Sequence, residues 1–149
     1  MHDSKKQTLD RHLISEIRRV LDPMETPGAL DMSEALLTDT RLDGRYVVEE
    51  GLGRGAFAFT YRARDEKLGE TVAIKELFPE NCQRRGLQVL PRNPAGADLL
   101  SRSVKWFSDE AQVLRGFRDP RIVEVRETFS QNGTIYYGGL VNRGHAALA

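Results

Sequence analysis

Cysteine is nearly absent from this chain of 149 residues, in which Cys82 is the only one. One cysteine cannot form a disulfide within the chain, and it cannot supply a cysteine-based metal cluster. The histidines, His2, His12 and His145, lie far apart and lack the short spacing of metal ligands. The sequence therefore predicts neither a disulfide framework nor a metal site.

A surplus of charge of either sign is also missing. Lysine and arginine together number 22, and so do aspartate and glutamate, which gives a formal net charge of zero. There is consequently no overall field to attract nucleic acid or an anionic membrane. No apolar run approaches the roughly 18 residues of a membrane-spanning helix, and the polar first residues lack the apolar region of a secretory signal. We expect a cytoplasmic protein without a nucleic-acid or membrane partner.

What remains is the composition of one globular domain with tails, with 40% hydrophobic and 30% charged residues. Residues 1–21 form an amino-terminal segment in which apolar residues recur at four-residue steps over 8–21, and this spacing predicts an amphipathic helix. Its charges of mixed sign favour docking on protein over binding to a membrane surface. Pro23, Pro27 and Gly28 break the pattern, so we expect a linker over residues 22–44.

A glycine-rich stretch follows a short β-rich run, residues 46–50. Residues 51–56 match the dinucleotide fingerprint G-x-G-x-x-A, which requires a helix to begin at the glycines. The next residues instead alternate with a period of two, which predicts a strand, with aromatic side chains at Phe57, Phe59 and Tyr61. The glycines therefore predict a hairpin whose tip folds over phosphates, with an ordinary glycine hairpin as the alternative.

An apolar strand, residues 71–77, carries a single lysine. With a period of two, Ala73, Lys75 and Leu77 share one face of this strand. The lysine ammonium then lies beside a small alanine on the face that the glycine hairpin can cover. Lysine supplies a point charge for phosphate, and alanine leaves room for a flat ring. The strand therefore predicts a binding site for a nucleotide.

A helix is predicted over residues 98–117, with Asp98 as its N-cap. Its apolar positions have helical spacing: Leu100, Val104, Phe107, Ala111 and Leu114. Glu110 lies at the margin of this stripe, where its carboxylate would be partly desolvated and would require a cationic partner. Lys75 is the predicted partner. The alternative is an exposed Glu110 that pairs with a basic residue of its own helix.

Two further segments flank this helix. Residues 78–97 read as a long loop, in which Gln83-Arg84-Arg85 is interpreted as a solvated basic patch. Residues 124–129 and 133–137 alternate around Asn132-Gly133, which predicts a β-hairpin.

Four motifs in this order resemble the amino-terminal lobe of a protein kinase, in the style of a bacterial serine/threonine kinase. They are the glycine-rich loop at residues 53–60, the third strand V-A-I-K at residues 72–75 and the C-helix E-A-Q-V-L at residues 110–114. The fourth is a D-P-R-I-V run at residues 119–123, which is similar to H-P-N-I-V. The resemblance implies an α+β fold over residues 45–137. That fold is a twisted five-stranded antiparallel sheet with one C-helix.

The resemblance also implies an ATP site. Lys75 would hold the α- and β-phosphates, and Glu110 would fix its position. The phosphates would be covered by the loop residues Gly53, Arg54, Gly55, Ala56, Phe57 and Ala58. The adenine would be roofed by Leu52, Thr60 and Ala73. Two residues depart from the family pattern, because Ala58 replaces the third glycine and Thr60 stands where valine is usual.

The resemblance stops after Tyr137. Residues 138–149 read GGLVNRGHAALA, an atypical tail that we interpret as a frameshift or premature stop in a kinase gene. The sequence contains no H-R-D, D-F-G or A-P-E run, so the catalytic base and the ligands that hold Mg²⁺ in the family are missing. We expect a fragment that binds ATP weakly at most and is inactive alone. The alternative is a non-catalytic interaction module that binds a protein partner, and an open lobe face would favour self-association.

Overall fold

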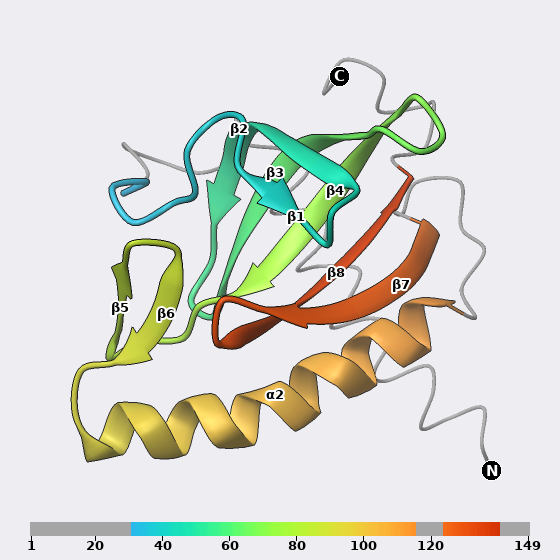
Figure 1. Cartoon of the computed structure of the whole chain (residues 1–149). Coiled ribbons are helices and arrows are strands. Elements are labelled where there is room, and N and C mark those ends of the chain that lie inside the picture. Colours follow the sequence, from blue (N-terminus) through green and yellow to red (C-terminus); the bar gives the residue numbers. More distant parts are fainter. Residues whose placement is uncertain (1–30, 116–123, 141–149) are drawn as a thin grey trace, which may run out of the picture.

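A computed structural model describes residues 31–115 and 124–140 of the chain (Figure 1). The helix predicted over residues 8–21, the D-P-R-I-V run at 119–123 and the tail from residue 141 lie outside the described residues. The described elements are β1 (Arg41–Leu42), β2 (Tyr46–Arg54), β3 (Ala58–Asp65), β4 (Glu70–Leu77), β5 (Cys82–Arg85), β6 (Gln88–Pro91), α2 (Pro94–Arg115), β7 (Glu124–Gln131) and β8 (Thr134–Leu140).

One antiparallel sheet of six strands forms the body of the lobe, in the order β1-β2-β3-β4-β8-β7. Its five long strands are those expected from the sequence, and the two-residue β1 adds the sixth. Helix α2 runs along one side of the sheet, and the β5–β6 hairpin stands near the start of that helix (Figure 1). The α+β fold, with one helix packed on the sheet in the part of the chain that the structure describes, is therefore confirmed. No helix among the described residues is long and apolar enough to cross a membrane.

Strand alternation creates two hydrophobic cores, one on each face of the sheet, because successive side chains point to opposite faces. The helix-side core combines strand residues with the apolar stripe of α2: Ala58, Ala73, Leu77, Phe107, Ala111, Leu114, Val125, Ile135 and Tyr137. The outer core on the other face includes Leu36, Leu42, Tyr46, Val48, Phe59, Tyr61, Val72, Ile74, Phe78, Val89 and Tyr136. The structure thus confirms that Ala73, Lys75 and Leu77 lie on one face of β4, and that Val72 and Ile74 lie on the other.

Residues 31–44, expected as part of a linker, pack against the outer face. Leu36 and Leu42 are buried in the outer core. The Leu36 N–H donates to the Tyr61 hydroxyl at 3.0 Å. Met32 packs closely on Gly51, because a Cβ added to Gly51 would lie 2.4 Å from the terminal methyl group of Met32. This part of the chain therefore belongs to the folded lobe.

The segment expected as a long loop also differs from the prediction, because residues 82–91 fold as the β5–β6 hairpin. Helix α2 begins at Pro94, earlier than expected. Its N-cap is Asn93 instead of Asp98, since the Asn93 side chain accepts the Gly96 N–H at 2.7 Å. The sequence signal was weak here because the first turn, PAGA, has no apolar stripe.

The turn between β7 and β8 matches its prediction. Asn132 and Gly133 both have positive φ, 56° and 75°, as a two-residue hairpin turn of type I′ requires. Strand β8 continues beyond Tyr137 to Leu140, and Gly138 and Gly139 pair with Ile74 and Ala73 of β4. The change of sequence after Tyr137 therefore does not end the strand.

Candidate functional site

The glycine-rich run closes the hairpin between β2 and β3. Strand β3 begins at Ala58, directly after the turn, so a strand follows the glycines and the dinucleotide interpretation is excluded. The Gly55 N–H donates to the Ala58 carbonyl at 2.8 Å, and the Phe78 N–H donates to the Phe57 carbonyl at 2.7 Å. These two hydrogen bonds hold the turn beside the end of β4.

Lys75, Glu110 and Tyr137 form a buried polar cluster between the sheet and α2. The Lys75 Nζ lies 2.8 Å from Glu110 Oε1, and the two side chains are only 7% and 1% exposed. The Tyr137 hydroxyl donates to the same carboxylate oxygen at 2.6 Å. The predicted Lys75–Glu110 ion pair is therefore present, and an exposed Glu110 paired within its own helix is excluded.

Local structure explains why these groups meet. Strand register places Lys75 directly opposite Tyr137 on β8 and opposite Thr60 on β3. Glu110 is three residues after Phe107, so it lies on the same side of α2 as that buried ring. The Lys75 ammonium is 5.9 Å from the Phe107 ring centroid and 5.7 Å from that of Tyr137. Aromatic faces and a carboxylate together compensate the buried positive charge.

Tyr137 had no assigned role in the sequence interpretation. The predicted hairpin fixes which residues of β8 share a face, but it does not reveal which strand lies on the other side of β8. Only the sheet order, with β8 inserted between β4 and β7, brings Tyr137 opposite Lys75. This order depends on pairing between β4 and β8, which are about 60 residues apart in the sequence. Local sequence patterns do not predict such pairing.

The other proposed binding residues differ in how deeply they are buried. Ala58 and Ala73 belong to the helix-side core that surrounds Lys75. Leu52, Gly53 and Thr60 are also buried, whereas Ala56 and Phe57 at the turn are exposed.

The Arg54 side chain points away from Lys75. Its guanidinium carbon lies 4.3 Å from the ring centroid of Phe59 and 5.1 Å from that of Phe78, and both rings belong to the outer core. Only the backbone of Arg54 can therefore face a ligand held by Lys75.

Two buried oxygen atoms close to Lys75 have no hydrogen-bond partner within the described residues. They are Oε2 of Glu110 and Oγ1 of Thr60. A buried polar atom without a partner destabilises the fold by about 1–3 kcal/mol, so such atoms are uncommon in folded proteins.

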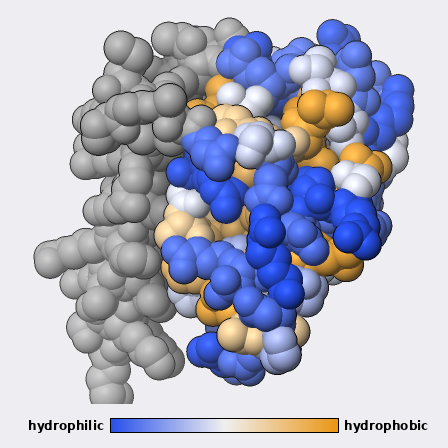
Figure 2. All heavy atoms as spheres, turned by 90° about the vertical axis from the view of Figure 1, so that its left-hand side faces the viewer, coloured by the Kyte–Doolittle hydropathy of each residue, from blue (hydrophilic) through white to orange (hydrophobic). Residues whose placement is uncertain are grey.

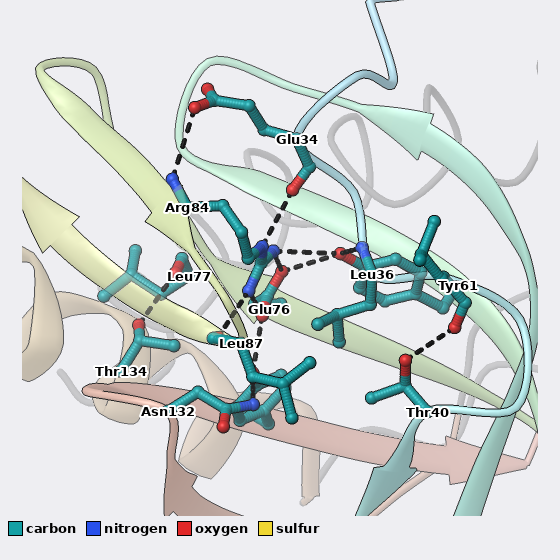
Figure 3. A network of polar contacts seen from close by, with 12 residues as sticks. Glu34, Leu36, Thr40, Tyr61, Glu76, Leu77, Arg84, Leu87, Asn132 and Thr134 are labelled. Carbon is teal, nitrogen blue, oxygen red and sulfur yellow. Dashed lines mark hydrogen bonds and ion pairs between the residues drawn. The ribbon is translucent and has the colours of Figure 1, made fainter.

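A second buried cluster, centred on Glu76 and Arg84, lies on the outer face (Figure 3). Arg84 binds the Glu76 carboxylate through two N–H groups, at 2.6 and 2.9 Å. The Tyr61 and Tyr136 hydroxyls donate to the same carboxylate at 2.7 and 2.5 Å. Burial, together with the Glu76 charge, raises the pKa of both tyrosine hydroxyls, so they remain protonated donors.

The interpretation of Gln83-Arg84-Arg85 as a solvated patch was therefore wrong for Arg84, whose side chain is only 9% exposed. Arg85 is exposed as expected. The Arg84 backbone and side chain also bond to Glu34, at 3.2 and 2.9 Å. The second cluster thus ties the β5–β6 hairpin and residues 31–44 to β4.

Known proteins similar to this chain are protein kinases. CBL-interacting protein kinase 19 of Oryza sativa subsp. japonica is 35% identical over 94 residues, which are 63% of this chain and 15% of that protein. The probable serine/threonine-protein kinase pknA2 of Bifidobacterium longum is 32% identical over 92 residues, 62% of this chain and 10% of that protein. The chain therefore spans only a small part of these relatives. No protein-family model matches the sequence.

The fold is similar to a solved structure described as PpkA-294 in its apo form. The TM-score is 0.67 at 29% sequence identity, and the match covers 72% of this chain and 38% of the other. The packing of helix α2 against a curled antiparallel sheet and the similarity to serine/threonine kinases agree with each other. We conclude that this chain carries the amino-terminal lobe of a serine/threonine-protein-kinase-like domain.

Proposed function

We propose that this lobe binds ATP, with Lys75 as its phosphate ligand. The observation that carries the proposal is the buried Lys75–Glu110 ion pair, which lies on the sheet face next to the glycine turn. The residues fit a nucleotide, since Lys75 offers an ammonium to phosphate and the absence of side chains at Gly53 and Gly55 lets the backbone of the turn approach a ligand closely. Ala73, on the same face of β4 as the lysine, has only a methyl side chain, which suits the approach of a flat base.

Glu110 and Tyr137 prepare the lysine for this role. A free lysine side chain has many rotamers, and ordering it costs free energy when a ligand binds. Here the ammonium is already held by Glu110, whose carboxylate is itself oriented by the Tyr137 hydroxyl. The pair therefore presents a charge in a fixed place within a region of low dielectric, where its attraction to phosphate is strong.

We further propose that this lobe binds nucleotide without transferring a phosphoryl group by itself. Kinases transfer phosphate by means of an aspartate base and Mg²⁺ held by an asparagine and an aspartate. The sequence contains no run that corresponds to the motifs carrying these residues. Transfer to a protein hydroxyl, in any assembly that includes this lobe, requires those groups from elsewhere.

Calorimetry with ATP tests the binding proposal. Lys75→Met keeps the apolar stem of the side chain and removes its charge, so it is expected to abolish most of the affinity. Lys67→Ala, at an exposed position in the turn after β3, is the control and is expected to bind as the wild type does. Circular dichroism confirms that each variant is folded. Binding that Lys75→Met leaves unchanged would contradict the phosphate role.

A second candidate function is a non-catalytic module that binds a protein partner. An exposed aromatic pair favours it: Phe57 and Trp106 are 36% and 37% exposed, and their ring centroids lie 5.8 Å apart. Exposed aromatic side chains are frequent anchors in protein interfaces. On the side shown in Figure 2, hydrophobic residues form separate patches among hydrophilic ones. A pull-down that loses its partner with Phe57→Ala supports this function, and one that captures nothing contradicts it.

A further inference from the structure

Residues 31–40, which we call the strap, lie against the outer core and form neither a helix nor a strand. Figure 1 draws them as the blue segment that precedes β1. Leu36 is their one buried residue, and Glu34 and its partner Arg92 have side chains that are 30% and 51% exposed. A segment with so few buried contacts can detach at a lower free energy than the strands beneath it.

The strap is bonded to β2, the strand that leads into the glycine turn. The Asp39 N–H donates to the Val48 carbonyl at 2.8 Å, and the Val48 N–H donates to the Thr40 carbonyl at 2.9 Å. Nearer the turn, Gly51 has no side chain, and Met32 packs where one would be, since a Cβ there would lie 2.4 Å from its terminal methyl group. Met32 therefore meets β2 close to the base of the glycine turn.

The strap is also joined to the next two strands of the sheet (Figure 3). The Leu36 N–H donates to the Tyr61 hydroxyl of β3 at 3.0 Å. The Glu34 carbonyl and carboxylate accept hydrogen bonds from Arg84 at 2.9 and 3.2 Å. Tyr61 and Arg84 both bind the Glu76 carboxylate of β4. The strap thus connects β2, β3 and β4, the three strands that carry the proposed ATP site, from their outer face.

We propose that the strap is a clamp that holds the glycine turn in position for ATP, with Met32 as its positioning residue. This inference rests on the proposed ATP binding. The turn joins β2 to β3, and the strap fixes both strands before a ligand arrives, so less ordering remains for the ligand to impose. Release of the strap then lowers the affinity for ATP. The strap acts through the strands, because its apolar residues pack on the outer core.

Met32→Ala tests the clamp, because it removes the contact with Gly51 and leaves the bonds of the strap to β3 and β5 in place. Met32 is only partly buried, so the melting temperature should fall only slightly. The affinity for ATP, measured by calorimetry, should fall by about three- to tenfold, within the range of energetic coupling between separated groups. Leu37→Ala, at a strap residue that is 79% exposed, is the matched control and should bind ATP as the wild type does.

Gly51→Ala tests the same contact from the other side. Gly51 does not have the positive φ that would strain alanine, and apart from its chain neighbours the terminal methyl group of Met32 is the one atom of the described residues within 4 Å of the added Cβ. Alanine should therefore displace Met32 and weaken ATP binding as Met32→Ala does. The double variant should bind ATP no more weakly than either single variant. Losses that add up would show that the two changes do not act through one contact, and the inference is then overturned.

Trp106 reports the turn without any ligand, because its ring centroid lies 5.8 Å from that of Phe57. Met32→Ala and Gly51→Ala should shift the tryptophan emission of the folded, ATP-free protein, and Leu37→Ala should not. A purely structural role of the strap would lower the melting temperature and leave this emission unchanged. A loss of ATP affinity without an emission change would mean that the effect does not pass through the turn, which overturns the clamp.

The outcomes separate this inference from the proposed function. If the wild type binds ATP and both single variants bind it equally well, the clamp is wrong while ATP binding stands. If the wild type binds no ATP, the proposed function is contradicted, and the clamp is wrong with it. Weaker binding in Met32→Ala and Gly51→Ala, with shifted emission and nearly unchanged melting temperatures, supports the clamp.

Discussion

Lys75 and Glu76 are neighbours in β4, yet each forms a buried ion pair on a different face of the sheet. Lys75 pairs with Glu110 of α2 at 2.8 Å, and Glu76 pairs with Arg84 of β5 at 2.6 Å. Because the two side chains share one stretch of backbone, a shift of β4 that disturbs one pair disturbs the other. The strand thus connects the helix on one face with the hairpin on the other.

Strand β8 repeats this arrangement with two tyrosines. Tyr136 donates to Glu76 on the outer face, and its neighbour Tyr137 donates to Glu110 on the helix side. Each buried carboxylate therefore receives a cation and at least one phenol. Charge-assisted hydrogen bonds of this kind are stronger than neutral ones, which explains how both carboxylates are accommodated inside the lobe.

Tyr137→Phe is expected to lower both stability and ATP affinity. The change removes one hydrogen bond to the Glu110 carboxylate, and the free energy of unfolding should fall by about 1 kcal/mol or slightly more. The carboxylate is then less firmly oriented toward Lys75, so ATP should bind more weakly. Urea unfolding and calorimetry measure the two effects.

Tyr46→Phe is a suitable control for this prediction. The Tyr46 hydroxyl donates to the Glu127 carboxylate, away from Lys75. This change should cost stability while ATP affinity stays as in the wild type. Equal ATP affinity in Tyr137→Phe and the wild type would show that Tyr137 has no part in orienting the pair.

Arg84→Ala is expected to be among the most destabilising single changes in the lobe. It leaves the buried Glu76 carboxylate without its cation, and removing one partner of a buried pair costs about 3–5 kcal/mol. Arg85→Ala, at the exposed neighbouring position, should change stability by less than about 0.5 kcal/mol. Urea unfolding distinguishes them, and similar small losses in both variants would restore the interpretation of this run as a solvated patch.

Sequence patterns predicted the helix-side face well and the outer face poorly, for a physical reason. Lys75 and Glu110 could be paired in advance because strand alternation and helical spacing each place one charge at the edge of an apolar stripe. Glu76 and Arg84 meet only because a hairpin folds back over the sheet, and neither local pattern reports that. The packing of Leu36 against β3 depends in the same way on long-range contacts.

Gly96→Ala is expected to destabilise the lobe although alanine is normally the better helix former. The added Cβ would lie 2.2 Å from the Asn81 carbonyl oxygen, so the start of α2 must move away from the base of the hairpin. We expect a loss of about 1–3 kcal/mol, as for other overpacked sites. Ser101→Ala, exposed on the same helix, should instead stabilise slightly. Thermal unfolding measures both, and a gain with Gly96→Ala would contradict the close contact.

Asp65→Asn should destabilise the lobe at neutral pH and much less in acid. Arg45 donates to both carboxylate oxygens of Asp65, at 2.8 and 2.7 Å, and holds the pKa of this buried carboxyl below its usual value. The lowered pKa means that ionised Asp65 stabilises the fold above the unfolded-state pKa of about 3.9. This contribution is lost as the pH falls through the lower pKa of the folded state.

Unfolding free energies of wild type and Asp65→Asn, measured from pH 7 down to pH 3, check this prediction. The difference between the two proteins should be largest near pH 7 and should shrink below about pH 4. Asp98→Asn serves as control, because the Asp98–Arg102 pair is exposed and contributes little at any pH. A difference for Asp65→Asn that does not vary with pH would mean that its charge is unimportant.

Trp106 should report the position of the glycine turn. It is the only tryptophan of the chain, it lies on α2, and its ring contacts Phe57 at the tip of the turn with centroids 5.8 Å apart. Phe57→Ala removes this contact and should shift the tryptophan emission to longer wavelength, because the ring becomes more exposed to water.

If the turn moves when it covers a nucleotide, ATP should change the emission of the wild type and have a much smaller effect on Phe57→Ala. Fluorescence titration measures both changes. An ATP response that Phe57→Ala retains in full would show that the signal arises from α2 itself and not from the turn.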